Sequence, residues 1–227
     1  LTIAQKEALR AKQEKLLFVL PPIIGNYFFP NIVSKLIATG LIEQLETKEA
    51  GSQALLKLLL DGSLDFCLLG SLEPLTQPAL KAETFAQTSF KIIVSKQHPL
   101  AQKKAVYFSE LKDERFIVHN EGFIHDKVLK LLAQKEHFRP DVIYRTNYVH
   151  VLKSMVASNT GIACLTDIAL SPNDDFSVLE LLDEHQPKFL LSIVTRATQV
   201  MTPAKKQLLD ILHDTVYHSP LGKETKQ

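Results

Sequence analysis

"AGSQALLKLLLDGSLDFCLLG", residues 50–70, places a helix directly before a buried strand. Ser52 is a candidate helix N-cap, the leucines between residues 55 and 60 form the helix body, and Gly62 ends it. The segment LDFCLL that follows is a short apolar run typical of a buried strand. A helix and a strand in such close succession indicate an α/β fold.

Strand-like and helix-like segments continue to alternate on both sides of this stretch. Pro21-Pro22 stops an apolar strand at 15–20, and an amphipathic helix follows at 29–40, after which ATGLIEQ leaves the start of the next strand open. Further strands are expected at 90–95, 115–119, 141–145, 161–165 and 188–195. Further helices are expected at 123–136, at 148–158 and from Thr202-Pro203 onward, and Ser109 could cap a short one. This alternation predicts an α/β fold with mostly parallel sheets.

Length and charge exclude several classes of protein. The 227 residues allow one large domain or two small ones, and 45% hydrophobic with 22% charged residues is an ordinary globular composition. With 26 basic and 25 acidic residues, the chain lacks the field needed to hold nucleic acid by itself. No apolar run is long enough to span a membrane, and the first residues do not form a signal peptide, so we expect a cytoplasmic protein without membrane contact. Leu1 in place of an initiator methionine suggests a fragment of a longer protein.

Motifs of the common enzyme classes are missing from the sequence. No GxGxxG, GxxxxGK[ST], GxSxG, HExxH or CxxC occurs, so we expect neither an enzyme nor a cofactor. Cys67 and Cys164 lie in apolar runs and are expected to be buried. The combination of His119, Glu121 and His125 has no recognised metal-ligand spacing, so solvated or core-edge histidines are the preferred interpretation over a metal site.

Several motifs together resemble the effector-binding half of LysR-type transcriptional regulators. A strand ends in His-Pro-Leu-Ala (KQHPLA, 96–101) and is followed by a short helix and an apolar strand, as in that family. PPIIGNYFFP resembles the turn after the family's first strand, and EAGSQALLKLLLDGSLDF resembles its capped helix and Gly-x-Leu-Asp strand entry. HFRP resembles its Phe-x-Pro motif, and LKSMVASNTGIACLTD resembles its Val-Ala-x-Gly-x-Gly-Ile-x-x-Leu segment. The resemblance covers roughly residues 15–217. Asn159 stands where the family usually has Gly, and Asn tolerates the left-handed backbone that Gly would supply.

The resemblance implies a periplasmic-binding-protein-like (type 2) architecture of two Rossmann-like subdomains joined by two crossover strands. Subdomain I would comprise residues 16–88 plus 196–218, and subdomain II residues 89–195, with hinge strands near 84–95 and 188–196. Residues 1–15 resemble the end of a linker helix, and residues 219–227 are expected to be a disordered tail.

The resemblance also implies a small effector, bound in a cleft between the subdomains. Free N–H groups and helix-dipole ends near Pro22, Ile23, Ser52, Asn147 and Tyr148 would favour a small anion such as a carboxylate. The full set of residues expected at the effector consists of Pro22, Ile23, Ser52, Leu69, Gly70, Asn120, Phe123, Asn147, Tyr148 and Val149, while Gly161 serves backbone geometry only.

The expected function is ligand sensing and dimerisation in a transcription regulator. The family's assembly implies a homodimer, extended to a tetramer in the full-length protein, with DNA bound only through a winged helix-turn-helix that is absent here. A transporter's solute-binding protein of the same two-lobed fold is the alternative, and the upstream sequence would distinguish the two. An enzyme would need a general base, for which Asp65, Glu121 and Asp167 are the only carboxylates near strand ends.

Overall fold

The computed structural model describes residues 2–12 and 15–221. The chain forms two compact units, here called unit 1 (Leu1–Gln87 with Leu190–Gln227) and unit 2 (Thr88–Phe189). The return to unit 1 was expected at residues 195–196, but strand β11 (Phe189–Arg196) pairs with β3 (Phe66–Ser71) from Leu190 onward, which assigns this segment to unit 1. Of the tail expected to be disordered, residues 222–227 lie outside the described residues.

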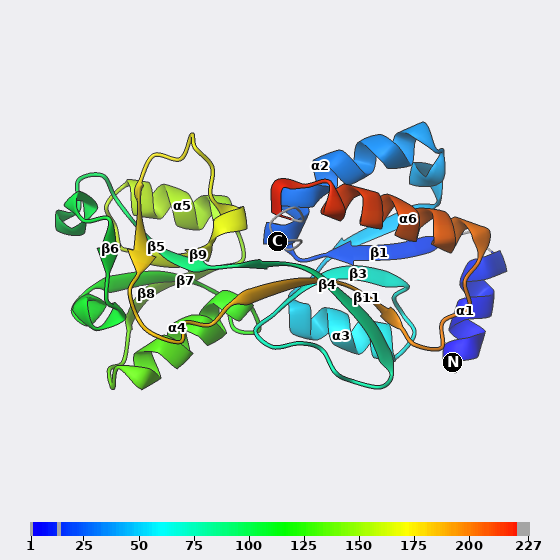
Figure 1. The fold of residues 1–227 in the computed structure, drawn as a ribbon, viewed down its shortest axis with the longest axis horizontal. Coiled ribbons are helices and arrows are strands. Elements are labelled where there is room, and N and C mark those ends of the chain that lie inside the picture. Colours follow the sequence, from blue (N-terminus) through cyan, green and yellow to red (C-terminus); the bar gives the residue numbers. More distant parts are fainter. Residues whose placement is uncertain (1, 13–14, 222–227) are drawn as a thin grey trace. The chain divides into compact units, whose positions relative to one another are not determined.

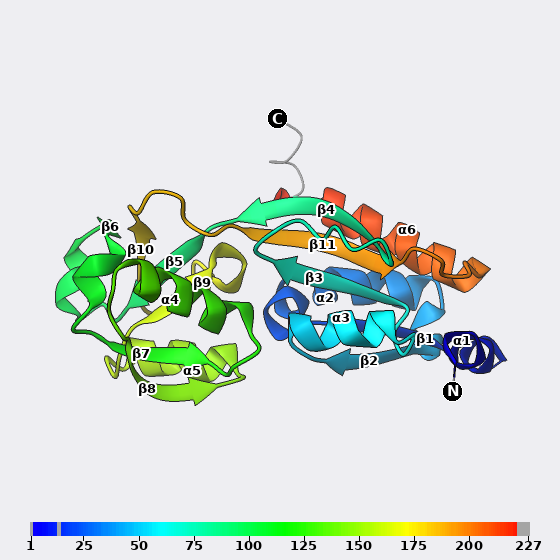
Figure 2. The same ribbon diagram turned by 90° about the horizontal axis from the view of Figure 1, so that it is seen from below.

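Unit 1 is a five-stranded sheet with helices on both faces (Figures 1 and 2). Its strand order is β2-β1-β3-β11-β4, in which β1 runs parallel to β2 and β3, and β11 runs antiparallel to β3. Helices α2 and α6 pack together on one face, and α3 covers the other. The bounds are β1 Leu16–Leu20, β2 Leu45–Glu49, β4 Leu80–Thr88, α2 Pro22–Ala38, α3 Ser52–Leu60 and α6 Pro203–Tyr217.

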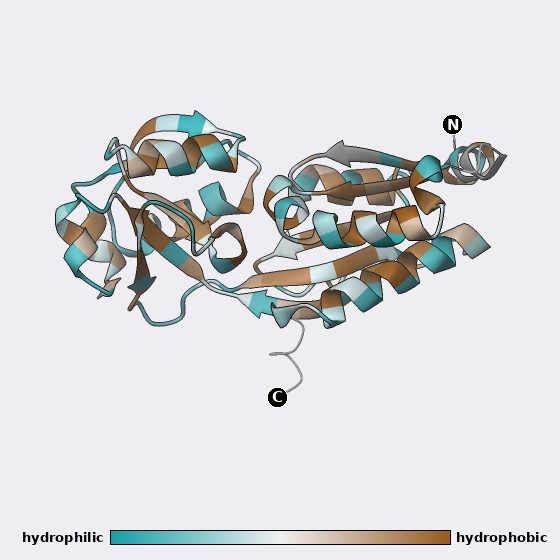
Figure 3. Cartoon of the chain, turned by 90° about the horizontal axis from the view of Figure 1, so that it is seen from above, coloured by the Kyte–Doolittle hydropathy of each residue, from teal (hydrophilic) through white to brown (hydrophobic). Residues whose placement is uncertain are grey.

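Alternate strand residues of unit 1 divide its core into two layers. Leu17, Val19, Cys67 and Leu69 join Leu55 and others in one buried cluster beneath α3, so their neighbours along each strand face α2 and α6. All residues of β1 and β3 are buried, as expected for parallel strands covered on both faces. Figure 3 shows the hydrophobic colour concentrated along the inner strands and mixed along the helices.

The structure corrects two expectations in unit 1. Helix α2 begins at Pro22, so the PPIIGNYFFP segment is helical rather than a turn; the fixed φ of proline suits the first helical position. Ser52 is the first residue of α3 and Gly51 is its N-cap, so Ser52 does not cap the helix. Gly62 follows the end of α3 with φ +74°, which confirms its predicted role. The open segment after α2 is a 3-10 helix, η1 (Leu41–Gln44), that leads into β2.

Unit 2 contains a four-stranded sheet of order β6-β10-β5-β9 and a parallel pair, β7-β8. The isolated bridge between Phe116 and Ile162 connects the two sheets. Because β5 runs antiparallel to both β9 and β10, the sheets are mixed, and the expectation of mostly parallel sheets is wrong. The sequence patterns did not predict two strands of this sheet, the short β6 and β10, one face of which is exposed. The bounds are β5 Phe90–Val94, β6 Ala105–Val106, β7 Arg115–His119, β8 Asp141–Thr146, β9 Ala163–Thr166, β10 Ser177–Leu181, α4 Ile124–Lys135, α5 Val149–Ala157 and η4 Asp167–Ala169.

The His-Pro-Leu-Ala motif is a capped turn. Nδ1 of His98 accepts a hydrogen bond from the Leu100 N–H at 3.2 Å, and its Nε2 lies 3.1 Å from the Glu114 carboxylate, so the imidazole starts η2 (Pro99–Gln102) and anchors it. The next turn, η3 (Phe108–Leu111), begins after Tyr107 and not at Ser109. The Glu110 carboxylate accepts from the Tyr107 N–H at 2.9 Å, a role that a serine inside the turn cannot take.

Asn159 and Gly161 meet backbone requirements that the sequence pattern predicted. Asn159 has φ +56°, the left-handed conformation that Asn tolerates. A Cβ on Gly161 would lie 2.6 Å from the Arg115 carbonyl oxygen, because the chain here runs against β7: the Ile162 N–H donates to the same oxygen at 2.8 Å. Gly161 therefore allows the close approach that connects the two sheets of unit 2.

A buried ion pair joins the first and last parts of unit 1. Lys205, at the start of α6, lies 3.0 Å from the Asp65 carboxylate, and both residues are buried. The same carboxylate accepts from the Leu17 N–H of β1 at 3.2 Å. Arg196, at the end of β11, donates to the carbonyls of Leu59 and Leu64. These contacts fix the returning segment against β1 and the α3–β3 turn.

The first helix, α1 (Ile3–Lys12), packs on that same turn from outside. The Lys6 ammonium donates to the Ser63 hydroxyl at 2.8 Å and to the Asp61 carbonyl at 3.0 Å, and a Cβ on Gly62 would lie 2.7 Å from Ile3. These contacts attach the polar helix expected at this end of the chain to unit 1.

Lys205→Met is expected to lower the free energy of unfolding by about 3 kcal/mol, because it removes the ammonium group that pairs with the buried Asp65 carboxylate. Urea denaturation measures this change. Lys206→Met, at an exposed neighbouring position, should change stability by less than about 0.5 kcal/mol. Equal losses in the two variants would contradict a special role for the ion pair.

Gly161→Ala is expected to cost roughly 2 kcal/mol, since its methyl group would collide with the Arg115 carbonyl. The matched control is Gly25→Ala within α2, where the nearest atom is a Leu20 side-chain carbon at 3.4 Å. Thermal unfolding should show a clear loss for Gly161→Ala alone. A melting temperature unchanged from the parent chain would show that the β7 contact is not required.

Candidate functional site

In unit 1, the five predicted effector residues lie at one edge of the sheet. Strands β1, β2 and β3 are parallel, with Leu20 opposite Glu49, so their carboxyl ends share this edge. Pro22 and Ile23 start α2 immediately after β1, Ser52 starts α3 after β2, and Leu69 and Gly70 lie near the end of β3. We call these residues edge cluster 1.

Edge cluster 1 presents two helix N-termini that no side chain caps. Neither Pro21 before α2 nor Gly51 before α3 makes a side-chain cap hydrogen bond. The first intrahelical bonds at these ends run from the Gly25 N–H to the Pro21 carbonyl and from the Leu55 N–H to the Gly51 carbonyl. The N–H groups of the earlier first-turn residues therefore have no partner within the helix, except at Pro22, which has no N–H. The positive ends of two helix dipoles therefore occur at the same edge of the sheet.

Side-chain direction separates the members of edge cluster 1. Leu69 belongs to the buried cluster beneath α3 and is 1% exposed, so it can offer a ligand only its backbone. Gly70 offers only backbone by its nature. Ser52 is 9% exposed, and its hydroxyl has no hydrogen bond within the described part of the chain. Ser52 is thus the side chain in this cluster with polar capacity to spare.

Unit 2 repeats the arrangement at the carboxyl edge of β7 and β8. The parallel register places His119 opposite Thr146, so Asn120 and Asn147, the next residues, are neighbours. The Asn120 side-chain amide donates to the Asn147 side-chain carbonyl at 2.8 Å, and the Asn120 N–H donates to the Thr146 carbonyl at 3.2 Å. The structure therefore brings together two residues that lie 27 positions apart.

Two more uncapped helices begin beside these asparagines. Phe123 is the N-cap of α4 and Tyr148 that of α5, and neither makes a side-chain cap bond. Tyr148 is 63% exposed, Phe123 is half-buried, and Val149 is the first residue of α5. We call Asn120, Phe123, Asn147, Tyr148 and Val149 edge cluster 2.

A buried histidine pair lies directly behind edge cluster 2, and its structure was not predicted from the sequence. His119 stacks on the Phe123 ring, with centroids 5.4 Å apart, and contacts His125 edge-on at 5.2 Å. His119 Nδ1–H donates to the Thr146 carbonyl at 3.1 Å, so Nε2 carries the lone pair, and it has no partner among the described residues. His125 Nε2 lies 3.4 Å from the Thr166 hydroxyl.

Burial keeps both imidazoles neutral. It lowers the pKa of His119, and it lowers the pKa of His125 well below the usual value, with repulsion from His119 as a smaller cause. Asp126 on α4 behaves differently: burial works to raise its pKa, but hydrogen bonds from Lys130 and Arg145 outweigh burial and lower the pKa. Asp126 therefore remains charged in an ion-paired environment.

Metal and thiol chemistry finds no support in the described residues. The Glu121 carboxylate accepts a hydrogen bond from Lys130 at the surface and does not join His119 and His125. Among residues 2–12 and 15–221, no group of three His, Cys, Asp or Glu side chains could hold a metal ion. Cys67 and Cys164 are buried, and burial raises the pKa of both thiols, that of Cys164 to about 12. Thiols protonated in this way are inert.

Comparison with known proteins identifies the family. Residues 10–216 match the family model described as LysR substrate binding domain. The malolactic fermentation system transcriptional activator of Lactococcus lactis is 33% identical over 195 residues, which cover 85% of this chain and 65% of the activator. The uncharacterized HTH-type transcriptional regulator YwbI of Bacillus subtilis is 29% identical over 194 residues, 84% of this chain and 63% of YwbI.

Solved structures show the same fold. The effector binding domain of QuiR in complex with shikimate superimposes with a TM-score of 0.74 at 14% identity, covering 90% of this chain and 98% of that one. A reduced form of OxyR from N. meningitidis gives a TM-score of 0.72 at 22% identity, with 91% and 96% covered. The Synechocystis CcmR regulatory domain in complex with 2-PG gives 0.75 at 18% identity, with 88% and 97% covered.

The chain thus has the type 2 periplasmic-binding-like fold of effector-binding domains, and it belongs to the LysR substrate-binding domain family. The relatives named here are transcriptional regulators and not enzymes. The chain spans about two thirds of the length of these relatives, 65% and 63%. No helix of the described residues is long and apolar enough to cross a membrane.

Stability is expected to fall as the pH drops below about 6.5, because His119 and His125 bind protons more readily in the unfolded chain than in the folded one. Each residue contributes up to about 1.4 kcal/mol per pH unit below the unfolded pKa. Thermal unfolding is measured at two pH values roughly one unit above and below this value, pH 7.5 and 5.5. The melting temperature should fall less between them in His125→Gln than in the parent chain. His150→Gln, at an exposed position, is the control. Equal falls in both variants would contradict the assignment.

Proposed function

We propose that this chain is the sensing and dimerisation part of a LysR-type transcriptional regulator, with a small carboxylate as its effector and the edge clusters as the groups that bind it. The observation that carries the proposal is the repetition of uncapped helix N-termini: α2 and α3 in unit 1, and α4 and α5 in unit 2. Free backbone N–H groups and helix dipoles favour an anion at each edge.

The edge clusters also suggest the size and charge of the effector. Their polar side chains are the Ser52 hydroxyl and the Asn120–Asn147 amide pair, and neither cluster contains a Lys or Arg. Neutral donors suit a single carboxylate with hydroxyl groups better than a phosphate, for which Arg is the stronger partner. Because a relative activates a malolactic fermentation system, lactate, which has one carboxylate, belongs first in a panel of candidate acids, with the dicarboxylate malate for comparison.

The rest of the proposal concerns the longer protein. A winged helix-turn-helix attached through α1 would bind DNA in the cytoplasm, and effector binding would change the spacing of two such domains in a homodimer or tetramer. Edge strand β8 supports pairing between copies, because Ile143 and Tyr144 are 38% and 46% exposed on it. The family assembly pairs opposite subdomains, so β2 of unit 1 is its expected counterpart.

Two alternatives are less well supported. An enzyme would need a free carboxylate as general base, but Asp65 pairs with Lys205, Asp167 lies 3.7 Å from Lys91, and Glu121 bonds to Lys130. A transporter's solute-binding protein shares the fold, but the relatives at 33% and 29% identity are transcriptional regulators. We therefore propose a sensor without catalytic activity or cofactor.

A carboxylate effector is expected to raise the melting temperature by several degrees when present at ~100 times its dissociation constant, which corresponds to ~2.7 kcal/mol. The measurement compares small carboxylic acids, malate and lactate included, with their neutral amides. In Ser52→Ala the shift should shrink, because a donor to the carboxylate is lost, and in Ser109→Ala, an exposed serine outside both clusters, it should persist.

The proposal fails if no acid in the panel shifts the unfolding transition. It also fails in part if amides stabilise the chain as strongly as the acids, since the helix N-termini would then not select an anion. A shift that is equal in Ser52→Ala and Ser109→Ala would place the ligand away from edge cluster 1.

A further inference from the structure

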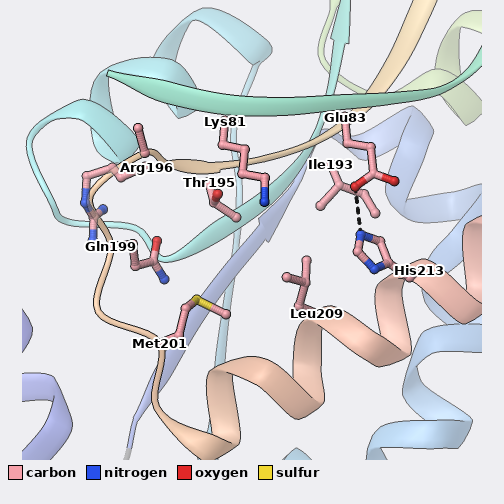
Figure 4. A pocket seen from close by; sticks show the side chains of 10 residues that line it. Lys81, Glu83, Ile193, Thr195, Arg196, Gln199, Met201, Leu209 and His213 are labelled. Atoms are coloured by element: carbon pink, nitrogen blue, oxygen red, sulfur yellow. Dashed lines mark hydrogen bonds and ion pairs between the residues drawn. The ribbon is translucent and has the colours of Figure 1, made fainter. Parts of the chain in front are cut away.

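A separate cavity of about 180 Å³ opens in unit 1 between the sheet and α6 (Figure 4). Its lining comes from β4, from β11 with the loop that follows it, and from α6. None of the residues of edge clusters 1 and 2 lines it. For scale, a cavity of about 150 Å³ is large enough for benzene. This cavity therefore has room for a small organic molecule.

One wall of the cavity carries a cation with spare bonding capacity. Lys81 and Glu83 alternate along β4, so both side chains face α6, and Figure 4 shows the Lys81 ammonium directed into the cavity. Within the described part of the chain, Lys81 has no hydrogen bond or ion pair. Glu83 is engaged, because its carboxylate bonds to His213 Nε2 at 3.0 Å and to the Tyr217 hydroxyl. Lys81 is thus available to an anion.

A second wall carries an amide without partners. The side-chain Nε2 and Oε1 atoms of Gln199 are both shielded from water, and neither has a hydrogen bond among the described residues. A buried amide in this condition loses its bonds to water without replacement. In Figure 4 it is directed toward Met201, a flexible side chain that is 45% exposed and can move aside for a ligand.

The remaining walls are apolar. Ile193 from β11, Leu209 from α6 and Met201 from the loop after β11 line the cavity. A ligand that fits would place an aliphatic group on these side chains. It would also bring an acceptor to Lys81 and Gln199 Nε2, and a donor to Gln199 Oε1.

We propose that this cavity is a second ligand site, and that it binds a short-chain 2-hydroxy monocarboxylate. The carboxylate accepts hydrogen bonds from the Lys81 ammonium and the Gln199 amide N–H, the 2-hydroxyl donates to the Gln199 carbonyl, and the alkyl chain packs on Ile193, Leu209 and Met201. This site shares no residue with the edge clusters, so its test does not depend on the proposed effector.

The two methionines of the chain provide a direct test. Met201 lines the cavity, and Met155 lies on α5 in unit 2, so ¹³C-methyl-methionine labelling gives one reporter and one internal control. In a titration with 2-hydroxypentanoate, the Met201 signal is expected to move and saturate while the Met155 signal stays in place. Pentanamide, which lacks the charge and the hydroxyl, should bind at least about tenfold more weakly.

Variants locate the contacts. Lys81→Gln and Gln199→Leu should each raise the dissociation constant about five- to tenfold, whereas Lys57→Gln, an exposed lysine on α3, should leave it unchanged. Gln199→Leu should not lower the melting temperature, because it removes the unpartnered amide, so lost binding there cannot be ascribed to unfolding. An unmoved Met201 signal, or unchanged affinity in both cavity variants, overturns the proposal. Movement of Met155 alone would assign the acid to unit 2 and overturn it equally.

Discussion

The buried pair of Asp65 and Lys205 is the contact on which the architecture of unit 1 depends. The chain leaves this unit after β4, builds the whole of unit 2, and returns as β11, so nothing in local sequence fixes the returning segment. Asp65 holds it by bonding both to Lys205 on α6 and to the Leu17 N–H of β1. Arg196 donates hydrogen bonds to the Leu59 and Leu64 carbonyls, which lie on either side of the α3–β3 turn that α1 contacts. A buried charge that has lost its partner is strongly unfavourable, which makes the returned arrangement the stable one.

With the sheet fixed in this way, the parallel register positions the polar groups. β1 and β2 in unit 1, and β7 and β8 in unit 2, end at matched positions, and a helix begins after each of them without a side-chain cap. Capping serines or aspartates would satisfy these N–H groups internally and stabilise the helices. Their absence at four helices leaves bonding capacity at both edges, which is the physical basis for proposing an anionic effector there.

Local patterns predicted most elements, and contacts distant in sequence account for the errors. The helix and strand at residues 50–70, the αL position of Asn159 and the buried cysteines followed from residue type and spacing. Strand β10 was missed because its pairing with β5 depends on residues more than eighty positions away, and the antiparallel crossings have the same origin. For the candidate site, the positions at strand ends could be predicted, but the burial of His119 against His125 and of Leu69 beneath α3 could not, because both depend on tertiary packing.

The proposed acid effector acts on edge clusters in both units, so its binding is expected to restrict the distance between them. Pulsed EPR on Lys57→Cys with Lys127→Cys, one exposed position in each unit, tests it directly, because native Cys67 and Cys164 are buried and resist labelling. We predict that an acid which raises the melting temperature also shifts and narrows the distance distribution between the two labels. An unchanged distribution at a saturating concentration of that acid would contradict it.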